Sequence, residues 1–161
     1  MVIITPYTGT DTEEILSLIL EIQQGEYHIS ITREDQPDLS DIASFYQIPG
    51  GAFFLARKEN QIVGTIGMLN IGNGQGALRK MFVHKEYRGS PHKTAEQLLR
   101  TLETWARNNG FREIFLGTTD RFIGAHKFYD KHQFTRLPKE DLPPAFPIMK
   151  VDSLFFYKEL E

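Results

Sequence analysis

The sequence predicts a mixed α/β domain (α+β, with one mixed sheet) over residues 1–161. Three observations support this prediction. The chain is 40% hydrophobic, which at 161 residues suits one domain with a proper core. Several segments repeat apolar residues at helical spacing, whereas short runs rich in Val, Ile and Phe between turn residues indicate strands. No internal repeat, low-complexity segment or linker divides the chain.

The N-terminal segment predicts a strand followed by a helix. Residues 2–4 form a short apolar run, and either Asp11 or Thr12 can cap the helix that follows. Gly25 is expected to end or bend this helix. Its apolar face consists of Ile15, Leu18, Ile19 and Ile22.

The middle of the chain predicts a short helix and three strands. The helix is expected over residues 39–46 with Asp38 as its cap, before a Pro-Gly-Gly break. Residues 52–57 and 62–69 read as a hairpin around a polar turn, and a Gly-rich turn leads into a strand over residues 77–83.

The C-terminal half alternates helices with strands. An amphipathic helix is predicted over residues 94–108, where Asn-Asn-Gly supplies a stop signal. A short buried strand over residues 114–117 and a helix over residues 123–132 follow. Two final strands, over residues 135–137 and 151–158, bracket a proline-rich loop.

A basic turn between strand 77–83 and helix 94–108 is the most informative feature. Five of the 18 Lys and Arg residues lie between Arg79 and Lys93, on a chain whose net charge is −3. A helix N-terminus favours an anion. A local basic loop on an acidic protein favours a phosphate-bearing small molecule over nucleic acid, which binds broader basic faces with interleaved aromatic residues.

The same segment resembles the acetyl-CoA motif of the GNAT family of N-acetyltransferases. The matching residues are Phe82-Val83, Tyr87-Arg88-Gly89, Ala95 and Leu98-Leu99. A second match, to the family's Ala-x-x-x-Tyr-x-x-x-Gly-Phe segment, lies downstream in Ala125-His126-Lys127-Phe128-Tyr129-Asp130-Lys131-His132-Gln133-Phe134.

The resemblance implies a mostly antiparallel sheet in which two parallel strands, residues 77–83 and 114–117, splay apart to admit acetyl-CoA. The implied cofactor-binding residues are Met81, Phe82, Val83, Arg88, Gly89, Ser90, His92, Lys93, Thr94 and Ala95. Lys93 stands where the family usually has a glycine, the loop is two residues longer than the common form, and Pro91 removes one amide donor.

Tyr129 aligns with the family tyrosine that donates a proton to the departing sulfur of CoA. The alternative is that its ring only fills the core. The sequence leaves the general base open, because Ala77 lies about where many relatives carry glutamate. The candidates are Glu26, His28, Asp120 or a water chain.

The charge is unevenly distributed. Residues 1–50 hold nine acidic residues and one Arg, whereas residues 51–161 hold 17 basic and 12 acidic residues. The acidic residues either form solvated helix faces or attract a cationic amine. Residues 26–29 and the loop through Phe146 are expected to wall the acceptor pocket.

The predicted function is acetyl-CoA-dependent N-acetylation of a primary amine, on a small molecule or a peptide. The alternative is a non-catalytic acyl-CoA-binding or regulatory domain. The absence of cysteine and of paired histidines predicts no metal site and a cytoplasmic location. The chain has no apolar run near 18 residues and no signal-like N-terminus, so we expect no membrane association. The aromatic segment 154–157 belongs either to the core or to a homodimer interface.

Overall fold

The central feature of the computed structural model, which describes all residues 1–161, is a seven-stranded sheet in the order β1-β2-β3-β4-β5-β7-β6. Every neighbouring pair is antiparallel except β4 and β5, which run parallel. The strands are β1 (Ile3–Pro6), β2 (Ala52–Lys58), β3 (Gln61–Gly72), β4 (Gln75–Val83), β5 (Glu113–Thr118), β6 (Thr135–Arg136) and β7 (Leu154–Glu159). The predicted mixed sheet is confirmed.

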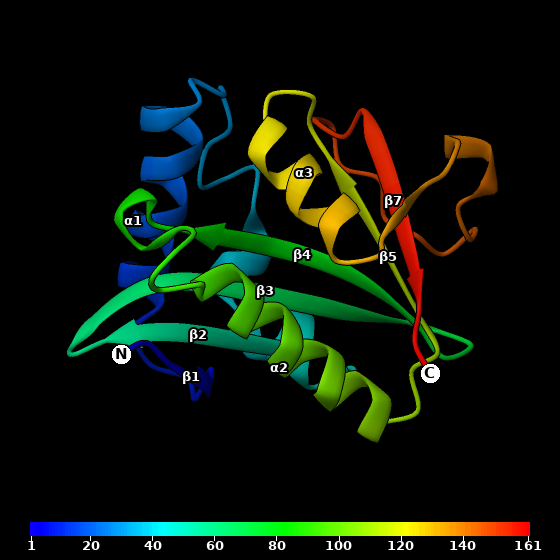
Figure 1. Ribbon diagram of the computed structural model, residues 1–161, viewed down its shortest axis with the longest axis horizontal. Coiled ribbons are helices and arrows are strands. Elements are labelled where there is room, and N and C mark those ends of the chain that lie inside the picture. The colour runs from blue at the N-terminus through cyan, green and yellow to red at the C-terminus, as the bar shows by residue number, and fades with distance from the viewer.

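Helices cover both faces of this sheet (Figure 1). The α-helices are α1 (Thr12–Leu20), α2 (Thr94–Asn108) and α3 (Ile123–Lys131). Shorter helical segments are the π-helical η1 (Glu21–Glu26) and η3 (Ala43–Gln47), and the 3₁₀-helical η2 (Pro37–Ser40), η4 (Lys85–Tyr87) and η5 (Lys139–Asp141). The predicted bounds of α2 are confirmed.

Strand β2 shows how the two faces are built. Phe54 and Ala56 pack in the cluster beneath α2 and α3, whereas Phe53 and Leu55 pack with the apolar face of α1. Because successive side chains of a strand point to opposite faces, a strand covered on both sides is apolar throughout. The final strand is also a core strand, since Phe155 and Phe156 are buried.

The pairing between β4 and β5 is short. The two strands pair only from Gln75 opposite Glu113 to Ala77 opposite Phe115, and β4 then continues to Val83 paired with β3 alone. Figure 1 shows the two strands together at one end and diverging toward the other. The predicted splayed parallel pair is therefore confirmed.

A bulge in β4 accompanies this divergence. Lys80 adopts a left-handed conformation (φ 55°) where the register against β3 shifts between Thr65 and Gly67. The Thr65 hydroxyl donates a hydrogen bond of 2.6 Å to the Lys80 carbonyl and holds the bulge in place. Since a bulge bends its strand and increases the local twist, it helps to turn the end of β4 away from β5.

The predicted helix over residues 39–46 is wrong. The chain forms η2 and η3 instead, separated around Asp41. The Asp38 side chain is buried and accepts a hydrogen bond of 2.6 Å from the Tyr46 hydroxyl, so it is not a helix cap. The Asp41 carboxylate accepts a hydrogen bond of 3.3 Å from the backbone N–H of Ser44. Tertiary contacts of Asp38 outweigh the local helical pattern here.

The predicted side-chain cap of the first helix is also absent. Asp11 is left-handed (φ 67°), and its carboxylate accepts a hydrogen bond from Arg57 at 2.8 Å. The Thr12 hydroxyl lies 2.9 Å from the Tyr7 hydroxyl. Gly25 falls within η1, where the helix widens rather than ending at that residue.

Gly51, at the entry to β2, tests the tight packing of this region. A Cβ atom at Gly51 would overlap the Met68 carbonyl oxygen and lie 2.6 Å from the Tyr46 carbonyl oxygen. We expect Gly51→Ala to lower the free energy of unfolding by about 3 kcal/mol, because the backbone must move. Gly124→Ala, with no atom within 4 Å of the new Cβ, should change it by less than about 1 kcal/mol. Equal urea midpoints for the two variants would contradict this prediction.

Candidate active site

A cavity of about 410 Å³ lies at the divergence of β4 and β5. Its walls include β4 residues beyond Ala77, β5 residues from Gly117 onward, and side chains that belong to both faces of the sheet. The cavity therefore connects the α2–α3 face with the face covered by α1 and the loop before β7.

On the α2–α3 face, Tyr129 and Met81 line the cavity together. The Tyr129 ring packs against Phe134 and Phe156, with centroid distances of 5.5 Å to both, while its hydroxyl lies 3.9 Å from the Met81 sulfur. Burial raises the pKa of Tyr129, so the phenol stays protonated at neutral pH. The residue thus fills the core and also presents a proton donor to the cavity.

The loop from Gly89 to Lys93 leads into the start of α2. Lys93 is left-handed (φ 50°), and its backbone N–H donates a hydrogen bond of 2.7 Å to the Gly89 carbonyl. This conformation explains why a glycine suits the position. The lysine adopts the same backbone shape and adds a positive charge. Ser90, His92 and Lys93 flank the cavity without lining it, whereas Gly89 and Ala95 are in its wall.

The first turn of α2 offers unpaired donors. Gln97 is the first residue whose N–H donates along the helix, to the Lys93 carbonyl at 3.1 Å, which leaves the amides of Thr94, Ala95 and Glu96 at the helix start. The Thr94 hydroxyl is buried and has no hydrogen-bond partner. Thr94 is not in the cavity wall, so it is the unpaired amides of the helix start that make this turn suited to an anionic ligand.

Arg88 joins this loop to the other face of the sheet. Its guanidinium binds both carboxylate oxygens of Glu26, at 2.5 and 2.7 Å, and donates to the Val83 carbonyl at 2.7 Å. Hydrogen bonds from Arg88 lower the pKa of Glu26. Glu26 therefore remains ionised in an ion pair and does not line the cavity, which removes it as the base.

The opposite face supplies the predicted walls. Tyr27 and Ile29 line the cavity from one side, and Phe146 and Met149 from the other. Phe122 stands against Tyr27 with a centroid distance of 4.7 Å. His28 and Asp120, the remaining candidate bases, are exposed and lie outside the cavity wall.

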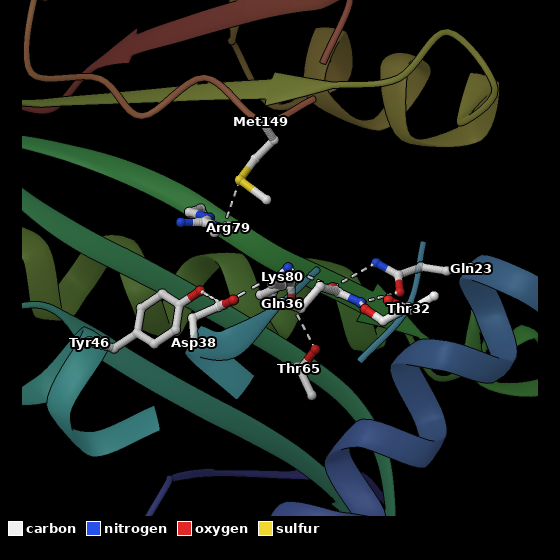
Figure 2. Close-up of polar contacts among 9 residues, drawn as sticks. All are labelled: Gln23, Thr32, Gln36, Asp38, Tyr46, Thr65, Arg79, Lys80 and Met149. Carbon is white, nitrogen blue, oxygen red and sulfur yellow. Dashed lines mark hydrogen bonds and ion pairs between the residues drawn. The ribbon is translucent and has the colours of Figure 1, made fainter. Parts of the chain in front are cut away.

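Lys80 is a cavity residue that the sequence analysis did not single out. Its ammonium group donates a hydrogen bond of 2.7 Å to Gln36 and lies 3.9 Å from the Asp38 carboxylate. Gln36 is paired in turn with Gln23 (Figure 2). Burial lowers the pKa of Lys80 from 10.5 to about 8.

Arg79 and Asp152 are two further charged residues in the wall. Arg79 extends from β4 toward Met149, whose sulfur lies 3.0 Å from the guanidinium (Figure 2). Asp152 accepts the Met149 backbone N–H at 2.8 Å, and burial raises the pKa of its carboxyl group. Neither side chain forms an ion pair within 4.0 Å.

This architecture has close relatives. A profile of the Acetyltransferase (GNAT) family matches residues 16–134. The solved structure of a GNAT-family acetyltransferase from Staphylococcus aureus is 40% identical over 100% of both chains, with a TM-score of 0.96. The chain belongs to the GNAT family.

Two curated proteins illustrate the range of proteins to which this chain is similar. N-acetylaspartate synthetase of Xenopus tropicalis is 32% identical over 123 residues, which cover 74% of this chain and 45% of that protein. Streptothricin acetyltransferase A of Bacillus subtilis is 36% identical over 91 residues, covering 56% of this chain and 51% of that protein. The chain spans about half the length of these curated relatives.

No three His, Asp or Glu side chains are grouped closely enough to hold a metal ion. None of the helices combines the length and the apolar character that crossing a bilayer requires.

One signal in the sequence could have directed attention to the charged residues of this GNAT site. Arg79 and Lys80 interrupt the otherwise apolar strand that the family motif identifies as lining the cofactor. Adjacent charges in a buried strand need partners or a ligand. Asp152 gave no such signal, because its position depends on how the loop before β7 folds over Gly117.

The lowered pKa of Lys80 predicts a pH-dependent stability. The unfolded chain holds this proton with a pKa of 10.5, whereas the folded chain releases it at about 8. Between these pH values the unfolded state binds more protons, so the free energy of unfolding rises with pH. From pH 7.5 to pH 10, the free energy of unfolding of the wild type should rise by about 2 kcal/mol more than that of Lys80→Met, as measured in urea titrations.

The control for this comparison is Lys139→Met, which removes an exposed lysine. It should follow the wild-type pH dependence. Parallel stability curves for the wild type and Lys80→Met would contradict the assignment of the pKa to Lys80.

Proposed function

We propose that the chain is an acetyl-CoA-dependent N-acetyltransferase that acts on a primary amine of an acceptor. The observation that carries this proposal is the cavity at the divergence of β4 and β5. It joins the start of α2, which suits a pyrophosphate, to a separate walled space on the other face of the sheet. Two substrates can therefore approach one point from opposite sides. Membership of the GNAT family supports the same reaction.

The residues around α2 fit the phosphates of acetyl-CoA. The unpaired amides of Thr94 and Ala95 and the Lys93 charge suit a pyrophosphate. Arg88 is bound to Glu26, so its role in our proposal is to shape the loop. Met81, Phe82 and Val83 lie on β4 beyond its pairing with β5, where the backbone groups on the β5-facing edge suit the amides of pantetheine.

When bound, acetyl-CoA supplies an activated acetyl thioester. The unpaired β4 amides would donate to its carbonyl oxygen and stabilise the negative charge that develops there. Tyr129, protonated and beside Met81, would give a proton to the departing sulfur. Because a thiolate is a fair leaving group, this donation assists the reaction without deciding it.

A second interpretation is a domain that binds acyl-CoA without turnover, which the absence of a glutamate at Ala77 favours. Titration with acetyl-CoA, using 3′-dephospho-CoA as a control, tests binding. Release of free thiol in the presence of an amine panel tests turnover. Micromolar binding with no thiol release would favour the second interpretation, and no binding at millimolar concentration would remove both.

In our proposal the enzyme is a single domain in the cytoplasm, where proteins are rarely stabilised by disulfides and a chain without cysteine loses no such bonds. Its relatives include one named for the acetylation of aspartate and one named for streptothricin. Both names are compatible with an amine on a small molecule, and a peptide amine remains within the proposal. A homodimer is a further prediction, to be tested by the mass of the protein in solution.

Replacing Lys93 tests the phosphate contact. Lys93→Gly removes the charge, and glycine adopts the left-handed backbone of this position without strain. Lys93→Ala would also remove the charge but would leave the left-handed backbone strained. We expect the acetyl-CoA Kd to rise about fivefold, or roughly 1 kcal/mol, in calorimetric titrations. Lys139→Gly, an exposed lysine in η5, should leave the Kd unaltered. Equal Kd values for Lys93→Gly and wild type would mean that Lys93 does not contact the phosphates.

Replacing Tyr129 tests the proton donor. Tyr129→Phe keeps the ring that packs against Phe134 and Phe156 and removes the hydroxyl. We expect kcat to fall roughly 10- to 100-fold with the acetyl-CoA Kd nearly unchanged, because only proton transfer is lost. Steady-state thiol release and calorimetry measure the two quantities. An unchanged kcat would show that the hydroxyl is only a core group.

A further inference from the structure

On the side of the cavity walled by Tyr27 and Phe146, which we call the acceptor side, a positive and a negative side chain, Arg79 and Asp152, lie without forming an ion pair. Ala77 and Phe115 belong to the apolar cluster beneath the loop before β7, so Arg79 and Gly117, two residues further along β4 and β5, face the same side. Asp152 covers Gly117 so closely that a Cβ there would lie 2.5 Å from its carboxylate oxygen. A guanidinium and a carboxylate thus face the same space from β4 and from the loop before β7.

These two groups have no charged partner of their own. Lys80 is paired with Asp38, and Arg88 with Glu26. By contrast, the one side-chain hydrogen bond of Arg79 is to the thioether of Met149, and the Asp152 carboxylate accepts one hydrogen bond, from the Met149 N–H. They lie further apart than an ion pair, although both Arg79 and Lys80 influence the Asp152 carboxyl group electrostatically. A guanidinium whose only partner is a thioether is poorly compensated in an apolar wall.

We propose that the acceptor is an amino-acid-type zwitterion, whose carboxylate binds Arg79 and whose amine gives its proton to Asp152. This inference rests on the proposed function and names its substrate class. A carboxylate can accept two parallel hydrogen bonds from the guanidinium fork. The ammonium group suits the one cavity carboxylate that is not already ion-paired. A polyamine fits poorly, because it would place further positive charge beside Arg79 and Lys80.

Apart from the polar side chains of Gln23 and Lys80, which bind each other through Gln36, most of the remaining acceptor wall is apolar. It is formed largely by Tyr27, Ile29, Ile31, Phe146 and Met149. These residues suit an uncharged, apolar side chain on the amino acid, so we expect leucine-, methionine- or phenylalanine-like acceptors to be preferred over aspartate or lysine.

The reaction balances with the groups present. The Asp152 carboxylate takes one proton from the ammonium and later returns it to solvent. The freed nitrogen forms a bond to the acetyl carbon while the C–S bond breaks. The sulfur leaves with the proton of Tyr129, and Tyr129 regains a proton from the nitrogen, directly or through water. The products are an N-acetyl amino acid, free thiol and one released proton. The raised pKa of the Asp152 carboxyl group favours its role as a base.

Matched acceptors test the substrate class. Thiol release is measured with the twenty common amino acids, with their amides, which lack the carboxylate, and with diamines. We expect at least one free amino acid to be turned over about 100-fold more efficiently, in kcat/KM, than its amide. Amides or diamines turned over as well as the acids, or no turnover of any amino acid by a protein that binds acetyl-CoA, would overturn the proposal. A protein that does not bind acetyl-CoA overturns the proposed function and this inference with it.

Variants of Arg79 test the carboxylate contact. Arg79→Gln should raise KM for the preferred amino acid about 100-fold, with little change for its amide and an unaltered acetyl-CoA Kd. Arg100→Gln, which removes an exposed arginine of α2, is the matched control and should behave as wild type. Equal losses for the acid and its amide in Arg79→Gln would show a merely structural role and overturn the assignment.

Asp152→Asn tests the base, because asparagine can still accept the Met149 N–H. We expect kcat at pH 7 to fall at least 30-fold and to recover toward pH 9, where the amine loses its proton to solvent. The charged groups that face Asp152 are Arg79 and Lys80, both on β4. A wild-type pH profile in Asp152→Asn would overturn its assignment as the base.

Discussion

The end of the parallel pairing at Ala77 and Phe115 is the constraint on which the rest of this structure depends. Backbone N–H and C=O groups in a sheet are normally satisfied by the neighbouring strand. Beyond Ala77, the β5-facing edge of β4 has no strand beside it, so its groups need a different partner. The cavity, the placement of Tyr129 in its wall and the access to it from both faces of the sheet all follow from this one opening.

The opening is maintained by polar contacts within the fold. The bulge at Lys80 is fixed on one side by the Thr65 hydroxyl and on the other by Gln36 and Asp38. Burying an ammonium group is costly unless it is paired and hydrogen-bonded, and here both conditions are met. The same contacts hold η2 against β4. The backbone geometry of the site and the placement of the acceptor wall therefore depend on one buried network (Figure 2).

The sequence predicted the parts of the fold that depend on local pattern. Helix α2 was predicted with correct bounds because its apolar stripe is regular and Asn109-Gly110 ends it. Motif spacing located Tyr129 and Met81, which do meet in the cavity. Asp38 was misassigned as a cap, and Asp11 occupies the N-cap position of α1 without a side-chain cap bond, because each carboxylate instead faces a cation on a distant strand, Lys80 or Arg57. Arg79, Lys80 and Asp152 were missed for the same reason: their roles depend on a bulge and on a loop folded across β5.

The ion pair between Arg88 and Glu26 has a consequence for how the two sides of the cavity are coupled. It connects the loop that begins α2 with η1, the segment just before Tyr27 in the acceptor wall. Arg121 adds a second tie, donating to the carbonyls of Tyr27 and His28 at 3.3 and 3.0 Å. A ligand that rigidifies the loop therefore also rigidifies the wall, and by thermodynamic reciprocity each ligand strengthens the binding of the other. Such coupling would favour a complex in which both sides of the cavity are occupied over a complex with either ligand alone.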